Sequence, residues 1–188
     1  MNFVKNFVVA VGLFIGIFPN IAHAESDLYL SPEVNLETLD IAVINSAKSS
    51  LDIAMYAFTD KPIAEALIAA ANRGVKIRLY RDKTQIKDKN DVLKKTDLLH
   101  ANSIMIKVKN NRFWNIMHLK AYLIDGRFLR EGSANWSPAG EGASCFRGGC
   151  GHKQQQDNTL LLTNDPKAVQ LFKTTFDRIW NRSSNLTY

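Results

Sequence analysis

Residues 118–135 read HLKAYLIDGRFLREGSAN, and this stretch predicts a β-hairpin that contains a regular pattern of polar residues. Two segments that read as strands, 118–124 and 128–131, lie on either side of Asp125-Gly126, a dipeptide that favours a tight turn between paired strands. Polar and glycine residues in the stretch follow the pattern H-x-K-x4-D-x6-G-S-x-N. The pattern places them at His118, Lys120, Asp125, Gly132, Ser133 and Asn135. A chance match at six positions has a probability on the order of 10⁻⁵ or less, so the pattern indicates a functional site.

Segments of alternating character extend from this hairpin in both directions. Short apolar runs bounded by turn residues predict strands, and longer segments with helical spacing of apolar residues predict helices. The predicted strands are 28–30, 51–58, 75–80, 104–108, 118–124, 128–131 and 159–163, and the predicted helices are 35–48, 62–73 and 166–180. Residues 82–97 are predicted to form a solvated loop with a helix, and 136–153 a long loop. The alternation predicts an α/β protein, an α/β/α sandwich with a mixed central sheet.

The N-terminus has the features of a secretory signal peptide. Lys5 precedes an apolar run at 7–18, which is shorter than the roughly 20 residues that cross a bilayer. Ala22-His23-Ala24 fits a cleavage site. We expect removal of residues 1–24, which leaves one domain at 25–188 that is exported to the periplasm or secreted. This cleavage removes one lysine, so the formal charge falls from +6 to +5 and still favours anionic partners.

The two cysteines lie close together in the glycine-rich segment. An exported protein meets oxidising conditions, so Cys145 and Cys150 are predicted to form a disulfide. Free thiols are one alternative. A metal site formed by both cysteines and His152 is another alternative. It would have only three ligands, whereas structural zinc sites usually have four. We therefore predict no metal site.

The residue types of the pattern fit chemistry on a phosphate group. On a strand, His118 and Lys120 face the same way, so imidazole and ammonium would project into one site. Lys120 suits a phosphate oxygen as a mobile point charge, and Ser133 and Asn135 add neutral donors. The pattern contains no cluster of carboxylates for magnesium. Phosphoryl transfer without a metal or other cofactor is therefore predicted, with donors stabilising charge on the phosphate oxygens.

The pattern resembles the HKD motif of the phospholipase D superfamily, and the chain is most similar to its small bacterial Nuc-type endonucleases. The resemblance extends over most of residues 25–188. It includes LYLSPE at 28–33, INSAKSSLDIAMYAFTD at 44–60, IAEALIAAANRGVKIRLYRD at 63–82 and FDRIW at 176–180.

The resemblance implies a role for each residue of the pattern. His118 would attack phosphorus and form a phosphohistidine, Lys120 would bind the phosphate, and Ser133 and Asn135 would line its pocket. Asp125 matches the motif aspartate, whose implied role is structural or electrostatic. An acidic residue downstream would orient His118, and Asp157 is the best match. Glu141 is the alternative to Asp157.

The chemistry requires two histidines, one as nucleophile and one as general acid, but the chain has one motif. His100 has no lysine two residues further on, and His152 is followed at once by Lys153. A homodimer that brings two His118 residues to one shared site resolves this shortage, as the resemblance to single-motif relatives also implies.

Three functions are compatible with the sequence. The first is a nonspecific exported endonuclease acting on DNA or RNA, the second a phospholipase D acting on lipid headgroups, and the third an inactive nucleic-acid-binding dimer. Phe113 and Trp114 are candidates for base stacking, a lipid entry or ordinary packing. A group of basic residues would track a nucleic-acid backbone or form a solvated face. This group is Lys76, Arg78, Arg81, Lys83, Lys87, Lys107, Lys109 and Arg112.

Overall fold

The computed structural model describes residues 24–112, 114–149 and 156–188. The predicted signal peptide at 1–24 lies outside these residues except for Ala24, so its cleavage stays a prediction. Among the residues described, no helix combines the length and apolar character needed to cross a membrane.

The centre of the fold is one eight-stranded mixed sheet. Its order is β1-β7-β6-β5-β2-β3-β4-β8, in which β2, β3 and β4 are parallel and the other neighbours antiparallel. The strands are β1 (Ser26–Ser31), β2 (Ser50–Met55), β3 (Lys76–Asp82), β4 (Ile104–Lys109), β5 (Lys120–Ile124), β6 (Phe128–Gly132), β7 (Asn158–Thr163) and β8 (Leu186–Thr187). The predicted hairpin is confirmed, because β5 and β6 pair directly across Asp125-Gly126.

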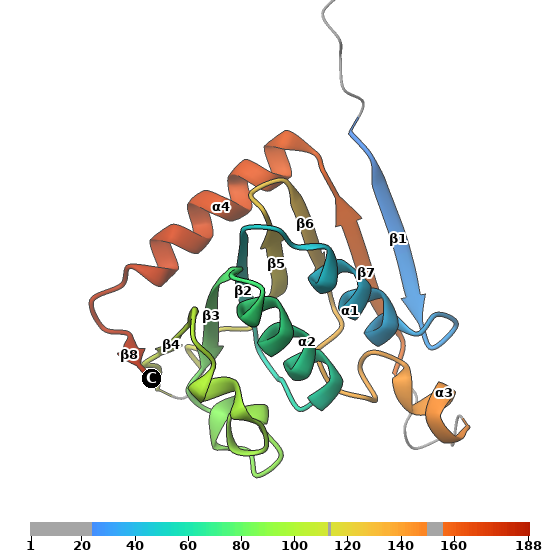
Figure 1. Ribbon diagram of the computed structural model, residues 1–188, viewed down its shortest axis with the longest axis horizontal. Helices are drawn as coiled ribbons and strands as arrows, with labels where there is room; N and C mark the ends of the chain where they lie inside the picture. The colour runs from blue at the N-terminus through green and yellow to red at the C-terminus, as the bar shows by residue number, and fades with distance from the viewer. Residues whose placement is uncertain (1–23, 113, 150–155) are drawn as a thin grey trace, which may run out of the picture.

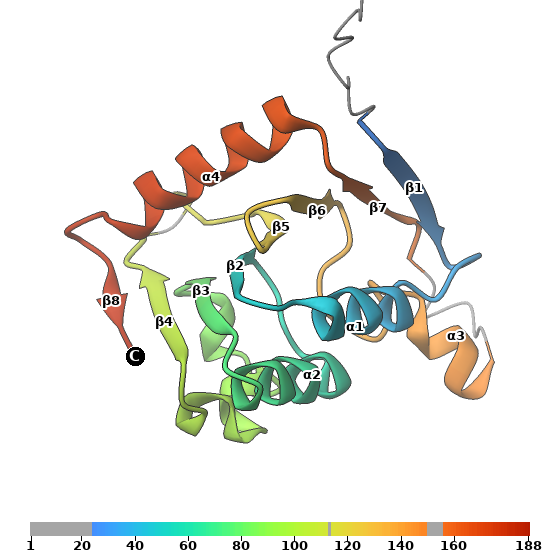
Figure 2. The same cartoon turned by 45° about the horizontal axis from the view of Figure 1, so that its top comes forward.

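Helices cover both faces of this sheet. Figures 1 and 2 show α1 and α2 on one face and α4 on the other, which confirms the predicted α/β/α arrangement. The helices are α1 (Leu36–Ser46), α2 (Lys61–Asn72), α3 (Ala143–Gly148) and α4 (Pro166–Trp180). Three short 3₁₀ helices connect β3 to β4: η1 (Gln85–Lys87), η2 (Val92–Lys94) and η3 (Asp97–His100).

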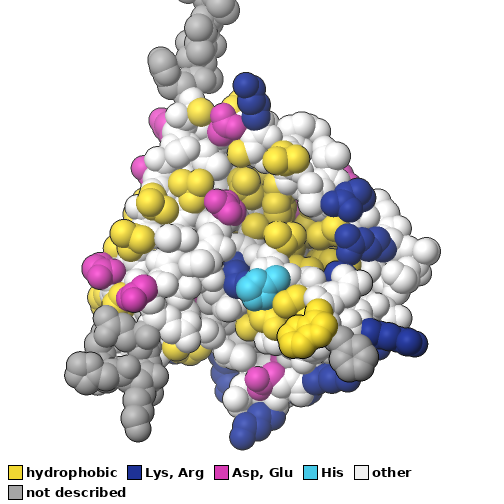
Figure 3. All heavy atoms as spheres, turned by 180° about the vertical axis from the view of Figure 1, so that it is seen from behind, with side chains coloured by type: hydrophobic (Ala, Val, Ile, Leu, Met, Phe, Trp, Pro, Cys, Tyr) yellow, Lys and Arg dark blue, Asp and Glu magenta, His cyan; other side chains and the backbone are white. Residues whose placement is uncertain are grey.

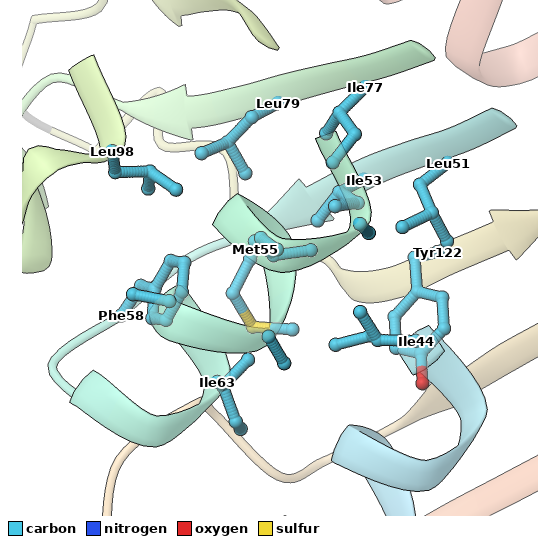
Figure 4. Packing of buried hydrophobic residues seen from close by; sticks show 14 of the residues in the cluster. Ile44, Leu51, Ile53, Met55, Phe58, Ile63, Ile77, Leu79, Leu98 and Tyr122 are labelled. Atoms are coloured by element: carbon cyan, nitrogen blue, oxygen red, sulfur yellow. The ribbon is translucent and has the colours of Figure 1, made fainter. Parts of the chain in front are cut away.

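The main core lies between the sheet and the helices α1 and α2. Alternate residues of β2, namely Leu51, Ile53 and Met55, are fully buried against Ile44 of α1 and Ile63 of α2 (Figure 4). This alternation follows from the two-residue period of a strand. The core therefore holds β2 rigidly, and β2 pairs with β5, which begins at Lys120 of the motif.

A smaller core lies on the opposite face, beneath α4. Phe176, Ile179 and Trp180 of α4 pack on Ala54 and Tyr80 of the sheet. Beside them Arg78 forms ion pairs with Asp52, at 2.6 Å, and with Asp177 of α4, at 2.9 Å. The helix is thus fixed to the half of the sheet that contains β2 and β3.

Three segments differ from the sequence prediction. Strand β5 begins at Lys120 and not at His118, and just before it the backbone N–H of Met117 donates to the carboxylate of Asp82, at 2.7 Å. The predicted loop at 136–153 contains α3, whose Arg147 pairs with Glu37 of α1. Residues 82–97 form 3₁₀ turns and no α-helix, and the short strand β8 was not predicted.

Candidate active site

His118 and Lys120 lie where β5 begins, and their side chains meet as the pattern predicts. The ammonium of Lys120 is 3.2 Å from both ring nitrogens of His118, and it donates a hydrogen bond of 2.9 Å to the His118 carbonyl oxygen. Although His118 precedes the strand, a hydrogen bond from the Tyr56 N–H to the Leu119 carbonyl, at 2.9 Å, extends the pairing with the β2 side. The two side chains therefore share one site.

Tyr56, just after β2, forms a wall for both groups. Its ring centre lies 4.4 Å from that of His118 and 5.1 Å from the ammonium of Lys120. Lys120 is 7% exposed, and burial lowers the pKa of its ammonium to about 8. Such a cation is poorly hydrated and therefore available to an anionic ligand.

The imidazole of His118 is tuned toward its neutral form. Burial, followed by the positive charge of Lys120, lowers the pKa of His118, and the nearby carboxylate of Asp82 opposes this shift. A nucleophilic imidazole requires an unprotonated nitrogen, so the direction of the shift suits attack on phosphorus.

Asp82 helps to position the site, although no role was predicted for this residue from the sequence. It is fully buried at the end of β3, and its carboxylate accepts hydrogen bonds from the backbone N–H groups of Met117 and Thr84. It thereby fixes the residue that precedes His118. A charged residue at the end of a buried parallel strand is a signal that could have identified it.

Ser133 and Asn135 follow β6 at the same end of the sheet, but both are engaged within the chain. The Ser133 hydroxyl contacts Asn158 at 2.9 Å and accepts the Thr159 N–H at 2.9 Å. The side-chain oxygen of Asn135, Oδ1, accepts a hydrogen bond from the Ala57 N–H at 3.2 Å. This leaves the side-chain NH₂ of Asn135 as a donor. The backbone of β7 approaches Gly132 closely, because a Cβ there would collide with the Thr159 carbonyl oxygen.

Asp125 lies at the other end of β5 and does not join the site. Its carboxylate accepts hydrogen bonds from the backbone N–H groups of Lys48, Ser49 and Ser50 and from the Ser49 hydroxyl. Partial burial opposes ionisation, but these hydrogen bonds prevail and lower the pKa of Asp125 to about 2. Of the two roles that the resemblance implied for Asp125, these hydrogen bonds fit the structural one.

Glu141, the alternative partner for His118, is buried elsewhere. It accepts a hydrogen bond of 3.2 Å from Arg130, which also binds Asp40 at 2.9 Å and the Lys120 carbonyl oxygen at 2.9 Å. Asp40 further accepts bonds from Tyr122 and Trp136. Burial, followed by the charge of Asp40, raises the pKa of Glu141 well above its usual range. This network supports the backbone of Lys120 from behind, so Glu141 does not orient His118.

Asp157 is exposed immediately before β7, at the same end of the sheet as Ser133. In the part of the chain that the structure describes, no hydrogen bond joins Asp157 to His118, so the orienting role stays a prediction. The disulfide also stays a prediction, because Cys145 lies in α3 but Cys150 lies outside the described residues.

The basic residues divide into two groups. Arg81 is fully buried and paired with Asp91 at 2.6 Å, and Arg78 is held by Asp52 and Asp177, so neither tracks a nucleic acid. Lys83, Lys109 and Arg112 form no ion pair among the residues described. Trp114 is 96% exposed, which contradicts the packing alternative within one chain, and Phe113 lies outside the described residues.

An apolar groove of about 300 Å³ adjoins the site between the sheet and α4. Leu119, Leu129 and Leu161 line its sheet side, and Leu171 and Phe172 line its helix side. Leu171 is 70% exposed. Figure 3, which shows the molecule from behind the view of Figure 1, has hydrophobic side chains gathered near its centre. Within the described ranges, no group of three or more His, Cys, Asp or Glu side chains is placed to hold a metal ion, and metal independence stays a prediction.

Comparisons with known proteins agree with this architecture. A family model described as "Cardiolipin synthase, PLD-like domain" matches residues 41–180. Mitochondrial cardiolipin hydrolase of Chlamydomonas reinhardtii is 28% identical over 138 residues, which cover 73% of this chain and 54% of that protein. The human protein of the same name is 26% identical over 143 residues, which cover 76% of this chain and 50% of that protein. The chain thus spans about half the length of these relatives.

Solved structures show the same fold. Nuc from Salmonella typhimurium, described as a phospholipase D family member, superposes with a TM-score of 0.73 at 23% identity, covering 88% of this chain and 99% of that one. NucT from Helicobacter pylori gives 0.72 at 23% identity, covering 88% and 100%. The family match over most of the sequence, on this fold and with this motif, shows that the chain belongs to the phospholipase D superfamily of phosphodiesterases and related hydrolases.

Proposed function

We propose that the chain is an exported, metal-independent phosphodiesterase that hydrolyses DNA or RNA without sequence preference. The observation that carries this proposal is the contact between His118 and Lys120 at the end of the sheet where β5 begins. An imidazole whose pKa is lowered lies beside the ammonium of Lys120 there, and this is the pairing that attack on a phosphodiester needs.

The proposed reaction has two steps. A ring nitrogen of His118 attacks phosphorus and forms an N–P bond while the P–O bond to one nucleoside breaks. The leaving oxygen takes a proton from the His118 imidazolium of a second copy of the chain. Water then attacks the phosphohistidine and gives one proton back to that second imidazole, which releases the phosphomonoester and restores both histidines. Lys120 and the amide NH₂ of Asn135 stabilise the charge on the phosphate oxygens.

A homodimer completes this reaction. His100, the other histidine of the described residues, lies in η3 on the segment between β3 and β4, and it lacks a lysine two residues further on. The apolar groove that begins at Leu119, next to His118, is a surface that a second copy would cover. We therefore propose a twofold dimer that places two His118 side chains at one shared site.

The same groove supports a second candidate function, a phospholipase D. An acyl chain beside the site would fill the space lined by Leu161, Leu171 and Phe172. The names of the relatives, mitochondrial cardiolipin hydrolases, point the same way. We favour the nuclease because Lys109 and Arg112, which form no ion pair among the residues described, lie on the chain that leads from β4 to His118.

A parallel assay separates the candidates. The protein without residues 1–24 is incubated in EDTA with plasmid DNA and, separately, with vesicles of phosphatidylcholine or cardiolipin. Cleavage of DNA in chelator supports the nuclease, and headgroup release supports the lipid enzyme. If neither substrate reacts but DNA is bound, the inactive binding dimer replaces both proposals.

Light scattering tests the shared site. The expected mass is twice that of one chain, and an active monomer would refute the dimer. Leu171→Asp is expected to reduce the dimer, whereas Leu99→Asp, at an exposed leucine of η3, serves as the matched control. A dimer that tolerates Leu171→Asp would place its interface elsewhere.

A further inference from the structure

The segment between β4 and β5 displays an indole in solvent next to the candidate site. Trp114 is 96% exposed, whereas Trp136 and Trp180 are buried. Full exposure is uncommon for so large an apolar side chain. Trp114 precedes His118 by four residues, so their Cα atoms are at most about 14 Å apart.

The backbone around Trp114 is held firmly on both sides. Asn111 is buried and accepts the Lys83 N–H at 3.3 Å, and Met117 is buried with its N–H on Asp82. Between these anchors, a turn is closed by the Asn115 N–H on the Arg112 carbonyl oxygen, at 3.2 Å. Lys109 braces the turn by donating to the Asn115 side chain at 2.6 Å. The indole is therefore presented by a turn whose flanking residues are hydrogen-bonded to the rest of the domain.

Several cations near this turn form no ion pair. Lys83, Lys109, Arg112 and Arg182 form no ion pair within the residues that the structure describes. Burial, followed by the charge of nearby Arg182, lowers the pKa of Lys109, and the carboxylate of Asp82 opposes this shift. In Figure 3, Lys and Arg side chains gather along the right-hand and lower edges of the face, and most Asp and Glu side chains lie toward its left.

We propose that this turn is a binding platform for single-stranded nucleic acid, in which Trp114 stacks on a base while Lys109, Arg112 and Arg182 contact backbone phosphates. The platform would hold the strand so that a neighbouring phosphodiester reaches Lys120 and His118. An aromatic ring flanked by unpaired cations is the arrangement that binds single strands without sequence preference. This inference rests on the proposed nuclease function and names the part of the site that selects a strand.

A membrane surface would also attract an indole and cations, but the flanking residues favour a nucleic acid. Asn110 and Asn115 on either side of Trp114 are exposed and polar, which disfavours insertion of the turn among lipid chains. A base stacked on the indole leaves both amides in water.

Binding is tested separately from catalysis, in the His118→Ala background so that the probe is not cleaved. The probe is a fluorescein-labelled oligo-dT, titrated in EDTA and monitored by anisotropy. Trp114→Ala is expected to weaken binding about 5- to 100-fold, the range seen when one stacked base loses its aromatic partner. Trp114→Phe should keep most of the affinity, and Leu99→Ala, at an exposed leucine far along the chain, should change nothing. Arg112→Gln should reduce the slope of log affinity against log salt by about 0.7.

The outcomes distinguish this inference from the proposed function. If wild-type protein cleaves DNA in EDTA while Trp114→Ala binds the oligonucleotide as tightly as its parent, the platform is refuted and the nuclease stands. If wild type neither binds nor cleaves nucleic acid, both fail. Loss of binding to anionic vesicles alone would reassign Trp114 to a membrane, and a lower mass of Trp114→Ala by light scattering would reassign it to the dimer interface.

Discussion

The two ends of β5 belong to one sequence motif but differ in how their polar groups are satisfied. At one end, Asp125 accepts four hydrogen bonds, and the pKa of its carboxyl falls to about 2. At the other end, burial leaves Lys120 with a pKa of about 8, and no carboxylate pairs with it among the described residues. A saturated group stabilises the fold, whereas a charged group without a partner is available to a ligand. The motif therefore combines a structural end and a reactive end.

The largest expected effect is at the reactive end. His118→Ala should reduce phosphodiester hydrolysis by at least about 10³-fold without lowering the melting temperature, because it removes the nucleophile. Rate measurements on the substrate that wild type hydrolyses would check this, with His100→Ala as the control. Full activity of His118→Ala would show that the end of β5 near His118 is not the reactive end.

Lys120 should show a smaller effect and a characteristic pH dependence. Lys120→Met is expected to reduce kcat/KM by roughly 10²- to 10³-fold, which is typical for loss of one charge-stabilising donor. Because the ammonium loses its proton as pH rises through about 8, wild-type activity should fall above that pH. Lys120→Arg should move this alkaline limb to higher pH, since arginine stays charged. If the activity of Lys120→Arg falls at the same pH as that of wild type, a group other than Lys120 is responsible for the fall.

A substitution of Asp125, at the structural end of β5, should lower the stability of the fold. Asp125→Ala removes four hydrogen bonds to a carboxylate and should lower the free energy of unfolding by about 2–3 kcal/mol. The folded variant should retain near-normal activity at 25 °C. Urea denaturation followed by circular dichroism would measure this, with the exposed Asp97→Ala as control. A variant that keeps its stability but loses activity would place Asp125 in catalysis.

The smallest effect concerns acid stability. The folded pKa of Asp125 is lowered from 3.8 to about 2, so its contribution is fully present above about pH 4 and is lost as pH falls through 2. Allowing for solvent screening of this partly exposed group, the contribution is about 1 kcal/mol. Asp125→Asn should therefore flatten the fall in stability between pH 4 and 2, as measured by urea titration at each pH. An equally steep fall would assign it to other carboxyls.

Local patterns in the sequence predicted much of this molecule. The hairpin around Asp125-Gly126, the strands beside it and the helices 35–48, 62–73 and 166–180 follow from spacing and turn residues, and the structure confirms them within a few residues. The pattern also identified His118 and Lys120 as neighbours. Asp82, Tyr56 and Arg130 received no role, because their contacts with the motif or with its support depend on strand order and long-range packing.

By itself the sequence determined the α/β class and the set of polar groups in the motif, because strand period and turn chemistry act over a few residues. Only the tertiary structure separated Asp125 from Lys120, buried Glu141 with Arg130 and left Trp114 in solvent. Those outcomes depend on which distant groups meet and which lose their contact with water. Hydrogen bonding and burial of this kind are set by the packing of the whole sheet, and no local spacing encodes them.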